Sequence, residues 1–200
     1  MKNKVALVLL TIVGTLVFAG SAAAQMDTWQ NDLNHSGAYF HVRHLLINNV
    51  RGSFHKMNVT VQYDPKDLSK TSIDATIDAT TIDTDVAPRD EDLRSAAYFD
   101  VAKFPTLTFK SKRVEAAGAG KMKLIGDLTI HGVTKEVTFD VEGPTPMAED
   151  ARKNTHMGAV ATTKINRKEF GITANPTVSD DVWITMELDL IKKVAPAGSN

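Results

Sequence analysis

The sequence predicts an all-β protein, an eight-stranded antiparallel barrel with one short helical insertion. Apolar and polar residues alternate with a period of two in about eight segments, as expected when one face of each strand is buried. Clusters of Gly, Pro, Asp and Asn separate these segments. One segment alone, residues 88–99, has the pattern of a helix, and it is short. Because a half-buried hairpin is not stable by itself, we expect the strands to assemble with one another.

The first 24 residues have the pattern of a secretory signal peptide. Lys2 and Lys4 precede an apolar run, and three alanines at 22–24 form a small-residue cleavage site. The apolar run is shorter than the roughly 20 residues that a bilayer-spanning helix needs. We therefore expect cleavage after Ala24, a periplasmic or secreted protein with a single domain at 25–194, and a flexible tail at 195–200.

Three strand segments precede the helix. Residues 36–44 place four side chains on one face: Ala38, Phe40, Val42 and His44. Residues 50–63 form a longer strand in which Phe54 and Met57 have opposite parity, so we expect a bulge or bend between them, for which Gly52 is a candidate. Residues 73–80 alternate most regularly, and one face carries Ile73, Ala75, Ile77 and Ala79.

The helical segment begins with Pro88 and three acidic residues, which the positive end of the helix dipole favours. Its Leu93, Ala97 and Tyr98 are expected to face the body of the protein. A strand at 105–114 then leads into the clearest hairpin of the chain, residues 121–143, whose strands join at 131–134 around Gly132. After it we expect a loop at 143–153, a strand at 155–165, a turn at 166–171 and a last strand at 178–191.

The interior of an eight-stranded barrel is either packed solid or holds one small ligand. Small residues on the inward faces favour a cavity: Ala75, Ala79, Gly126, Ala159 and Ala161. Small residues also let bulky neighbours interdigitate, so the alternation leaves both a ligand-binding barrel and a packed structural or interaction barrel open.

Charge and composition exclude several kinds of partner and site. The chain has 23 basic and 24 acidic side chains, and without Lys2 and Lys4 the net charge is about −3. No basic patch indicates a nucleic-acid partner. There is no cysteine, which excludes disulfides, zinc–thiolate sites and a lipid-anchored precursor.

The histidines near the start of the domain suggest two alternatives, a metal site and a hydrolase active site. His41 and His44 lie an odd number of residues apart, so on a strand they leave opposite faces and cannot share one ion. We predict no metal site and no catalytic residue. A small secreted Ser/His/Asp hydrolase remains the alternative, without a Gly-x-Ser-x-Gly motif to support it. Its candidates are Asp27, Asp32, His35, Ser36, Ser53 and His55.

Two polar groups are candidates for a binding site. His44 shares the face of Phe40 and Val42, so it would be a polar group at an apolar wall and would need a partner or a ligand. Arg89 and Arg94 flank acidic residues of the helical segment. They form either a solvated helix start with an intrahelical salt bridge or an anion clamp at the mouth of the barrel.

With these residues placed, the chain resembles the YceI-like family of exported bacterial proteins, a lipocalin-like group named for polyisoprenoid binding. The resemblance extends from about Trp29 to Leu190. It rests on short blocks in a fixed order: Asn34-His35-Ser36, Phe40-His41-Val42-Arg43-His44, Arg51-Gly52-Ser53-Phe54, Arg89-Asp90 through Asp100, Gly126 through Lys135, and Ile165-Asn166-Arg167 with Phe170-Gly171.

The resemblance implies a lipocalin-like barrel that binds, stores or transports a long-chain amphiphilic lipid, such as a polyprenyl phosphate, an isoprenoid quinone or a fatty amide, and not an enzyme. It implies no other cofactor, transient contact with a membrane, and a monomer or homodimer. We expect these residues along an apolar pocket: Phe40, Val42, Phe54, Ile77, Phe109, Leu128, Phe139 and Ile184. Arg89, Arg94 and His44 are the candidates near a polar head group.

Overall fold

The computed structural model describes residues 26–193. The predicted signal peptide and tail lie outside the described residues, so the domain boundaries at 25 and 194 stay predictions. The strands are β1 (Asp27–Asn31), β2 (Gly37–His44), β3 (Asn48–Phe54), β4 (Met57–Tyr63), β5 (Ser72–Asp78), β6 (Ile82–Asp83), β7 (Thr106–Ala116), β8 (Lys121–Ile130), β9 (Val133–Glu142), β10 (Ala148–Glu149), β11 (Thr155–Asn166) and β12 (Val178–Lys193). The helical elements are the α-helix α1 (Ala87–Arg94) and the 3₁₀ turns η1 (Leu68–Lys70), η2 (Ala79–Thr81) and η3 (Arg167–Phe170).

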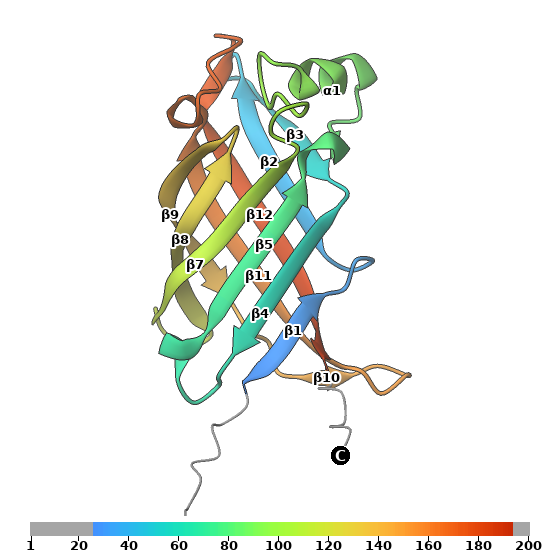
Figure 1. Cartoon of the computed structure of the whole chain (residues 1–200), viewed down its shortest axis with the longest axis vertical. Helices are drawn as coiled ribbons and strands as arrows, with labels where there is room; N and C mark the ends of the chain where they lie inside the picture. Colours follow the sequence, from blue (N-terminus) through green and yellow to red (C-terminus); the bar gives the residue numbers. More distant parts are fainter. Residues whose placement is uncertain (1–25, 194–200) are drawn as a thin grey trace, which may run out of the picture.

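The strands close into a barrel (Figure 1). Hydrogen bonding runs β11-β9-β8-β7-β5-β4-β1-β12, and β12 pairs again with β11 to complete the ring. The long strand β12 pairs along one edge with two short strands in succession, β2 near its start and β1 near its end. On their other edges, β2 pairs with β3 and β1 pairs with β4. The prediction of a closed eight-stranded antiparallel barrel with one short helix is therefore confirmed.

The hairpin of β8 and β9 is confirmed with a tighter turn than expected. Ile130 pairs with Val133, so the connection is the two residues His131 and Gly132. Their φ angles are 51° and 73°. Positive φ at both central residues is the signature of the turn whose twist matches two antiparallel strands.

Four local expectations need correction. The segment 50–63 is two strands, because pairing stops at Phe54 and resumes at Met57. Gly52 lies in regular register opposite Phe40, so it makes no bend there, and a side chain on it would collide with the Phe40 ring. The helix ends at Arg94 and Ala97 is exposed. The expected loop at 143–153 contains the short strand β10.

Two apolar clusters fill different parts of the barrel. One gathers around Trp29, which is fully buried with Met157 and Leu190, and lies at the end of the barrel where β1 pairs with the last residues of β12. The other lines the rest of the interior and extends to the segments beside α1. Trp29 and its neighbours thus close one end of the barrel as a floor.

Gly126 shows why small inward residues do not all indicate a cavity. A Cβ at this position would lie 2.8 Å from the Cα of Ser111 and would also collide with the Lys110 carbonyl and the Phe109 ring. The partner strand β7 has a bulge between Ser111 and Arg113, which brings its backbone close. Gly126 therefore provides room for a neighbouring strand and for Phe109, and it does not line the interior space.

We expect Gly126→Ala to lower the free energy of unfolding by about 1–3 kcal/mol, because the close atoms are mostly backbone and cannot rotate away. Urea unfolding measures this change. Gly158→Ala is the matched control, since the nearest atom to a Cβ there is 3.4 Å away, in the side chain of the loop residue Thr145. A loss from Gly126→Ala no larger than that from Gly158→Ala would contradict the packing argument.

Candidate functional site

An internal cavity of about 610 Å³ occupies the barrel between the Trp29 floor and α1. This volume lies within the range of about 300–1,000 Å³ that is usual for small-molecule sites. Side chains of the lining near α1, such as His44, Val86 and Pro88, are exposed to solvent, so the cavity opens at this end. The interior is therefore hollow, and the alternative of a fully packed barrel does not fit the described residues.

The cavity collects most of the side chains that the sequence indicated. Ten of the predicted site residues line it: Phe40, Val42, His44, Phe54, Ile77, Arg89, Phe109, Leu128, Phe139 and Ile184. Of the small inward residues, Ala75 and Ala161 line it, whereas Ala79 and Ala159 are not among the lining side chains. That these residues contact a ligand stays a prediction.

Aromatic rings form much of the cavity wall. Phe109 and Phe139 meet edge to face with their centroids 5.3 Å apart. Phe54 lies between Phe40, at 5.7 Å, and Phe99, at 5.9 Å. Such tilted and edge-to-face pairs are favourable arrangements of rings and hold each other in place. The wall is thus apolar and is built from rings that pack on one another.

Arg89 is a polar group at the open end of the cavity. Its Nε donates to the Thr84 hydroxyl at 2.8 Å and its Nη2 donates to the Thr84 carbonyl at 2.7 Å. The buried Asp90 carboxylate accepts from the Thr84 amide at 2.8 Å and from the same hydroxyl. Among the described residues, no ion pair involves Arg89, so the salt bridge considered for the helix start is absent there. Its Nη1 hydrogens have no partner within the same residues.

Two of the head-group candidates lie differently from the expectation. Arg94 is not among the residues that line the cavity, because its Nε and Nη2 donate to the carbonyls of Thr80 and Ile82 at 2.9 and 3.0 Å. Arg94 therefore fixes the helix to the segment before it. His44 lies at the rim and is exposed, so it is not a buried polar group that requires a protein partner.

Arg167 is a cavity-lining residue that the site prediction missed. It is buried, with 6% of its surface exposed, at the start of η3. Its guanidinium donates to the backbone carbonyls of the segment that leads into β12: Ile172, Ala174, Asn175, Val178 and Ser179. Arg167 has the same parity as Met157, Ala161 and Ile165, so the alternation of this strand could have predicted that it faces the interior.

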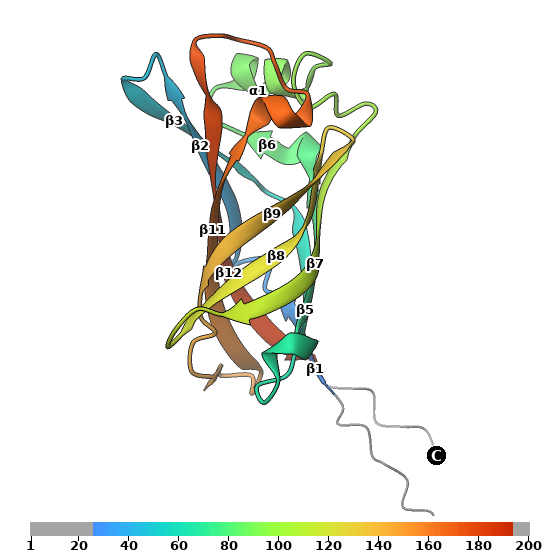
Figure 2. The same ribbon diagram turned by 90° about the vertical axis from the view of Figure 1, so that its left-hand side faces the viewer.

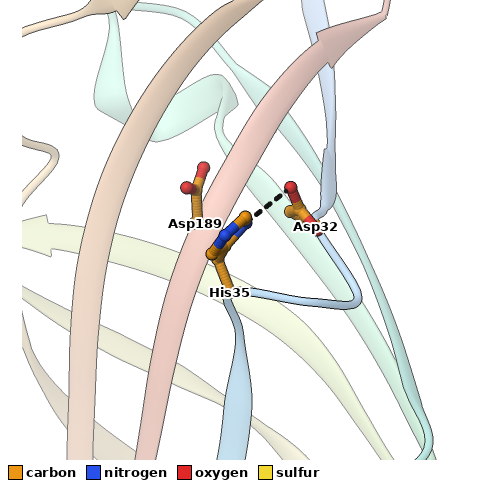
Figure 3. Close-up of side chains that lie close together, drawn as sticks. All are labelled: Asp32, His35 and Asp189. Carbon is orange, nitrogen blue, oxygen red and sulfur yellow. Dashed lines mark hydrogen bonds and ion pairs between the residues drawn. The ribbon is translucent and has the colours of Figure 1, made fainter. Parts of the chain in front are cut away.

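Outside the barrel, Asp32, His35 and Asp189 lie close together (Figure 3), with ligand-type atoms within 4.8 Å of one another. Carboxylate and imidazole groups are common zinc ligands. Here, His35 pairs with Asp32 at 3.0 Å, and Asp189 pairs with His156 at 2.6 Å. This arrangement is a partly buried network of ion pairs between the β1–β2 loop, β11 and β12, in which only His35 is exposed.

The hydrolase alternative finds little support in this network. The Ser36 hydroxyl donates to the Asp189 carbonyl at 3.1 Å and accepts from the Asp189 amide at 3.0 Å. His55 pairs with Asp83, and Asp27 pairs with Lys192. A nucleophilic serine needs a base within hydrogen-bond reach. Within residues 26–193, no serine hydroxyl is hydrogen-bonded to a histidine ring.

The ion pairs shift the pKa values of the groups involved. The hydrogen bond to Asp189 raises the pKa of His156 above 6.5, and the hydrogen bond to Asp32 does the same for His35. Hydrogen bonds from Asn154 lower the pKa of Asp150 to about 2. A raised histidine pKa contributes stability below pH 6.5 that is lost as the pH rises through the folded-state value. A lowered aspartate pKa contributes stability above pH 3.8 that is lost toward pH 2.

We expect Asp189→Asn to lower the pKa of His156, because the amide keeps the shape of the carboxylate but removes its charge. NMR titration of the histidine ring protons measures the shift directly. His41, which stacks on Trp183 and pairs with none of these carboxylates, provides the internal control, and its titration should not change. An unchanged His156 would show that Asp189 is not the cause of the raised pKa.

The fold and the cavity define the class of protein. A closed antiparallel barrel with an apolar cavity, one closed end and charged lining residues gathered at the open end is the architecture of lipocalin-like binding proteins. No helix among residues 26–193 is long and apolar enough to cross a membrane.

This chain belongs to the YceI-like family, whose domain model matches residues 29–190. A UPF0312 protein of Vibrio cholerae is 32% identical over 188 residues, which cover 94% of this chain and 96% of that protein. The crystal structure of the Campylobacter jejuni YceI protein matches with a TM-score of 0.69 and 30% identity, over 76% of this chain and 90% of that one. A polyisoprenoid-binding domain from Saccharophagus degradans shares the fold, with a TM-score of 0.64 and 13% identity over 82% and 98% of the two chains. The family resemblance expected from the sequence is confirmed.

Proposed function

We propose that this protein binds a long-chain amphiphilic lipid non-covalently in its barrel and stores or transports it. The observation that carries the proposal is the apolar cavity of about 610 Å³ with one open end. A chain inserted tail first would place its apolar part along the aromatic wall and its head group at the mouth. The polyisoprenoid-binding domain of Saccharophagus degradans, which has the same fold, supports a ligand of this class.

Elementary energetics make such binding favourable and reversible. Each methylene removed from water contributes about 0.8 kcal/mol, so a chain of several isoprene units has ample driving force. Ordering the chain and losing its contacts with other lipids offset much of this gain. The expected behaviour is exchange with membrane lipid through transient contact, and not irreversible capture.

Arg89 is the residue best placed to contact a head group. It lines the cavity at the open end, and its Nη1 donors have no partner among the described residues. A guanidinium binds a phosphate or a carbonyl oxygen through charge-assisted hydrogen bonds. The lipid candidates are a polyprenyl phosphate, an isoprenoid quinone and a fatty amide, and His44 at the rim is the second polar contact.

We place this activity in the periplasm or outside the cell, after cleavage near Ala24, in a protein that acts as a monomer or homodimer. It is proposed as a binding protein and not as an enzyme, with no nucleic-acid partner. The pattern of residues 1–24 supports export, and the Ser36 hydrogen bonds to the β12 backbone support a non-catalytic role.

Native mass spectrometry of protein purified from an exported fraction tests the proposal, followed by solvent extraction of the bound material. A discrete extra mass that is released as a long-chain lipid is the expected result. A clean apo mass would overturn it if it persists after incubation with polyprenyl phosphate, quinone and fatty amide. The same protein denatured before incubation is the control for nonspecific adducts.

A further inference from the structure

The tip of the β2–β3 hairpin is apolar and exposed. Leu45, Leu46 and Ile47 form the connection between the two strands, and 54%, 75% and 80% of their surfaces are exposed. Figure 2 shows this hairpin leaning outward from the rim at the end of the barrel that carries α1. Consecutive large apolar residues at one exposed tip are unusual in a soluble protein and mark an interaction surface.

The backbone of the tip is costly for these residue types. Leu45 and Leu46 have φ angles of 51° and 59°, in the left-handed region that Gly and Asn adopt more readily. The Leu45 amide donates to the Thr177 carbonyl at 2.7 Å, which ties the tip to the segment before β12. Glycine or asparagine would form this turn with less strain and would expose no apolar surface. Contacts within the fold therefore do not explain leucine at both positions, and an interaction with another molecule would.

The position of the tip relates it to the cavity. His44 is the last residue of β2 and also lines the open end of the cavity. Val42 and Val50, one on each strand of the hairpin, pair with each other and line the cavity as well. The exposed tip is thus a direct continuation of the cavity wall, at the open end of the cavity.

The charged side chains of the hairpin itself are all basic, and the neighbouring strand β12 carries Asp180 and Asp181, which pair with lysines. The sequence from 33 to 63 contains no aspartate or glutamate. Arg43 and Arg51 lie on the two strands below the tip, and both are exposed on the outer face. An apolar tip above basic side chains is suited to an anionic bilayer, where apolar residues enter the acyl boundary and arginines meet phosphate groups.

We propose that the β2–β3 tip inserts into the interfacial region of an anionic lipid bilayer and brings the open end of the cavity against the membrane. The inference rests on the proposed function for what passes between bilayer and cavity, but docking itself is measurable without any cargo. Three residues inserted at one point give a weak, reversible contact. A contact of this strength suits a protein that takes up a lipid at the membrane and then dissociates from it.

Flotation with vesicles of phosphatidylcholine and phosphatidylglycerol tests the proposal on the mature protein. The variants are Leu46→Asp and Ile47→Asp. Leu33→Asp is the matched control, because Leu33 lies in the β1–β2 loop and is 74% exposed, almost the same as Leu46. We expect each tip variant to lower vesicle partitioning roughly tenfold or more, with Leu33→Asp unchanged and binding weaker in pure phosphatidylcholine.

The outcomes separate docking from cargo binding. Loading with lipid presented in detergent solution should be the same for Leu46→Asp and the unmodified protein. If the unmodified protein never takes up lipid but its partitioning still depends on Leu46, docking stands and the proposed function fails. Partitioning that is absent, or equal in the Leu46→Asp and Leu33→Asp variants, overturns docking. So does a tip variant that changes only the oligomeric state in sedimentation, since the tip would then contact a second copy.

Discussion

Replacing Phe139 by aspartate is expected to abolish binding of an apolar chain. The ring is 6% exposed, lines the middle of the cavity and packs edge to face on Phe109. A carboxylate there has no partner, and burying an unpaired charge against a hydrocarbon chain costs several kcal/mol. Because each 1.4 kcal/mol is a factor of ten in affinity, we expect a loss of roughly a hundredfold or more.

Native mass spectrometry at a fixed lipid concentration measures the loss. The matched control is Val160→Asp, an apolar residue of β11 that is 39% exposed and does not line the cavity. Circular dichroism checks that both variants keep the barrel. We expect Phe139→Asp to fold, because an empty cavity can admit water around the new carboxylate.

A second variant keeps this prediction independent of charge. Ala161→Trp projects a large side chain into the cavity from β11 and should block the same ligand by volume alone. If both Phe139→Asp and Ala161→Trp fold and retain lipid, the ligand does not occupy this cavity. If Phe139→Asp loses the lipid and Ala161→Trp retains it, the buried charge and not the lost volume prevents binding.

Alternation made the cavity wall predictable. Successive strand residues point to opposite faces, so Phe40 and Val42, or Leu128 and Phe139, could be placed inside before their partners were known. The same rule placed His41 and His44 on opposite faces, and in the structure His41 stacks on Trp183 while His44 lines the cavity rim. Period-two reasoning fails where a strand is interrupted, as at residues 55–56, and where it is bulged, as in β7 between Ser111 and Arg113.

Features that depend on the register between strands could not be predicted. Gly126 and Ala161 are both small and inward in sequence, but only the bulge in β7 decides that Gly126 faces backbone while Ala161 faces the cavity. Arg94 was a head-group candidate because, with Arg89, it flanks the acidic residues of the helical segment. The direction of the helix instead points its guanidinium to the carbonyls of Thr80 and Ile82.

Arg167→Ala is expected to lower the free energy of unfolding by about 3 kcal/mol or more, because hydrogen bonds to a charged group contribute about 1.5–3 kcal/mol and their loss leaves acceptors unpaired. One guanidinium holds five carbonyls of the segment from Ile172 to Ser179. Arg167→Lys should rescue little of the loss, since an ammonium has three donors at one point and cannot span these acceptors.

Urea unfolding of the delipidated protein measures the effect without any contribution from a bound ligand. Lys168→Ala is the matched control: Lys168 is the next residue, is exposed and pairs at 3.0 Å with Asp180, a carboxylate that the Arg167 guanidinium also approaches at 3.4 Å. An exposed pair of this kind is worth at most about 1 kcal/mol. Hydrogen exchange should show the largest loss of protection at the Ile172 amide, which donates to the Arg167 carbonyl. A loss of stability no greater than that of Lys168→Ala would contradict this role, because the five carbonyls would then be satisfied without the guanidinium.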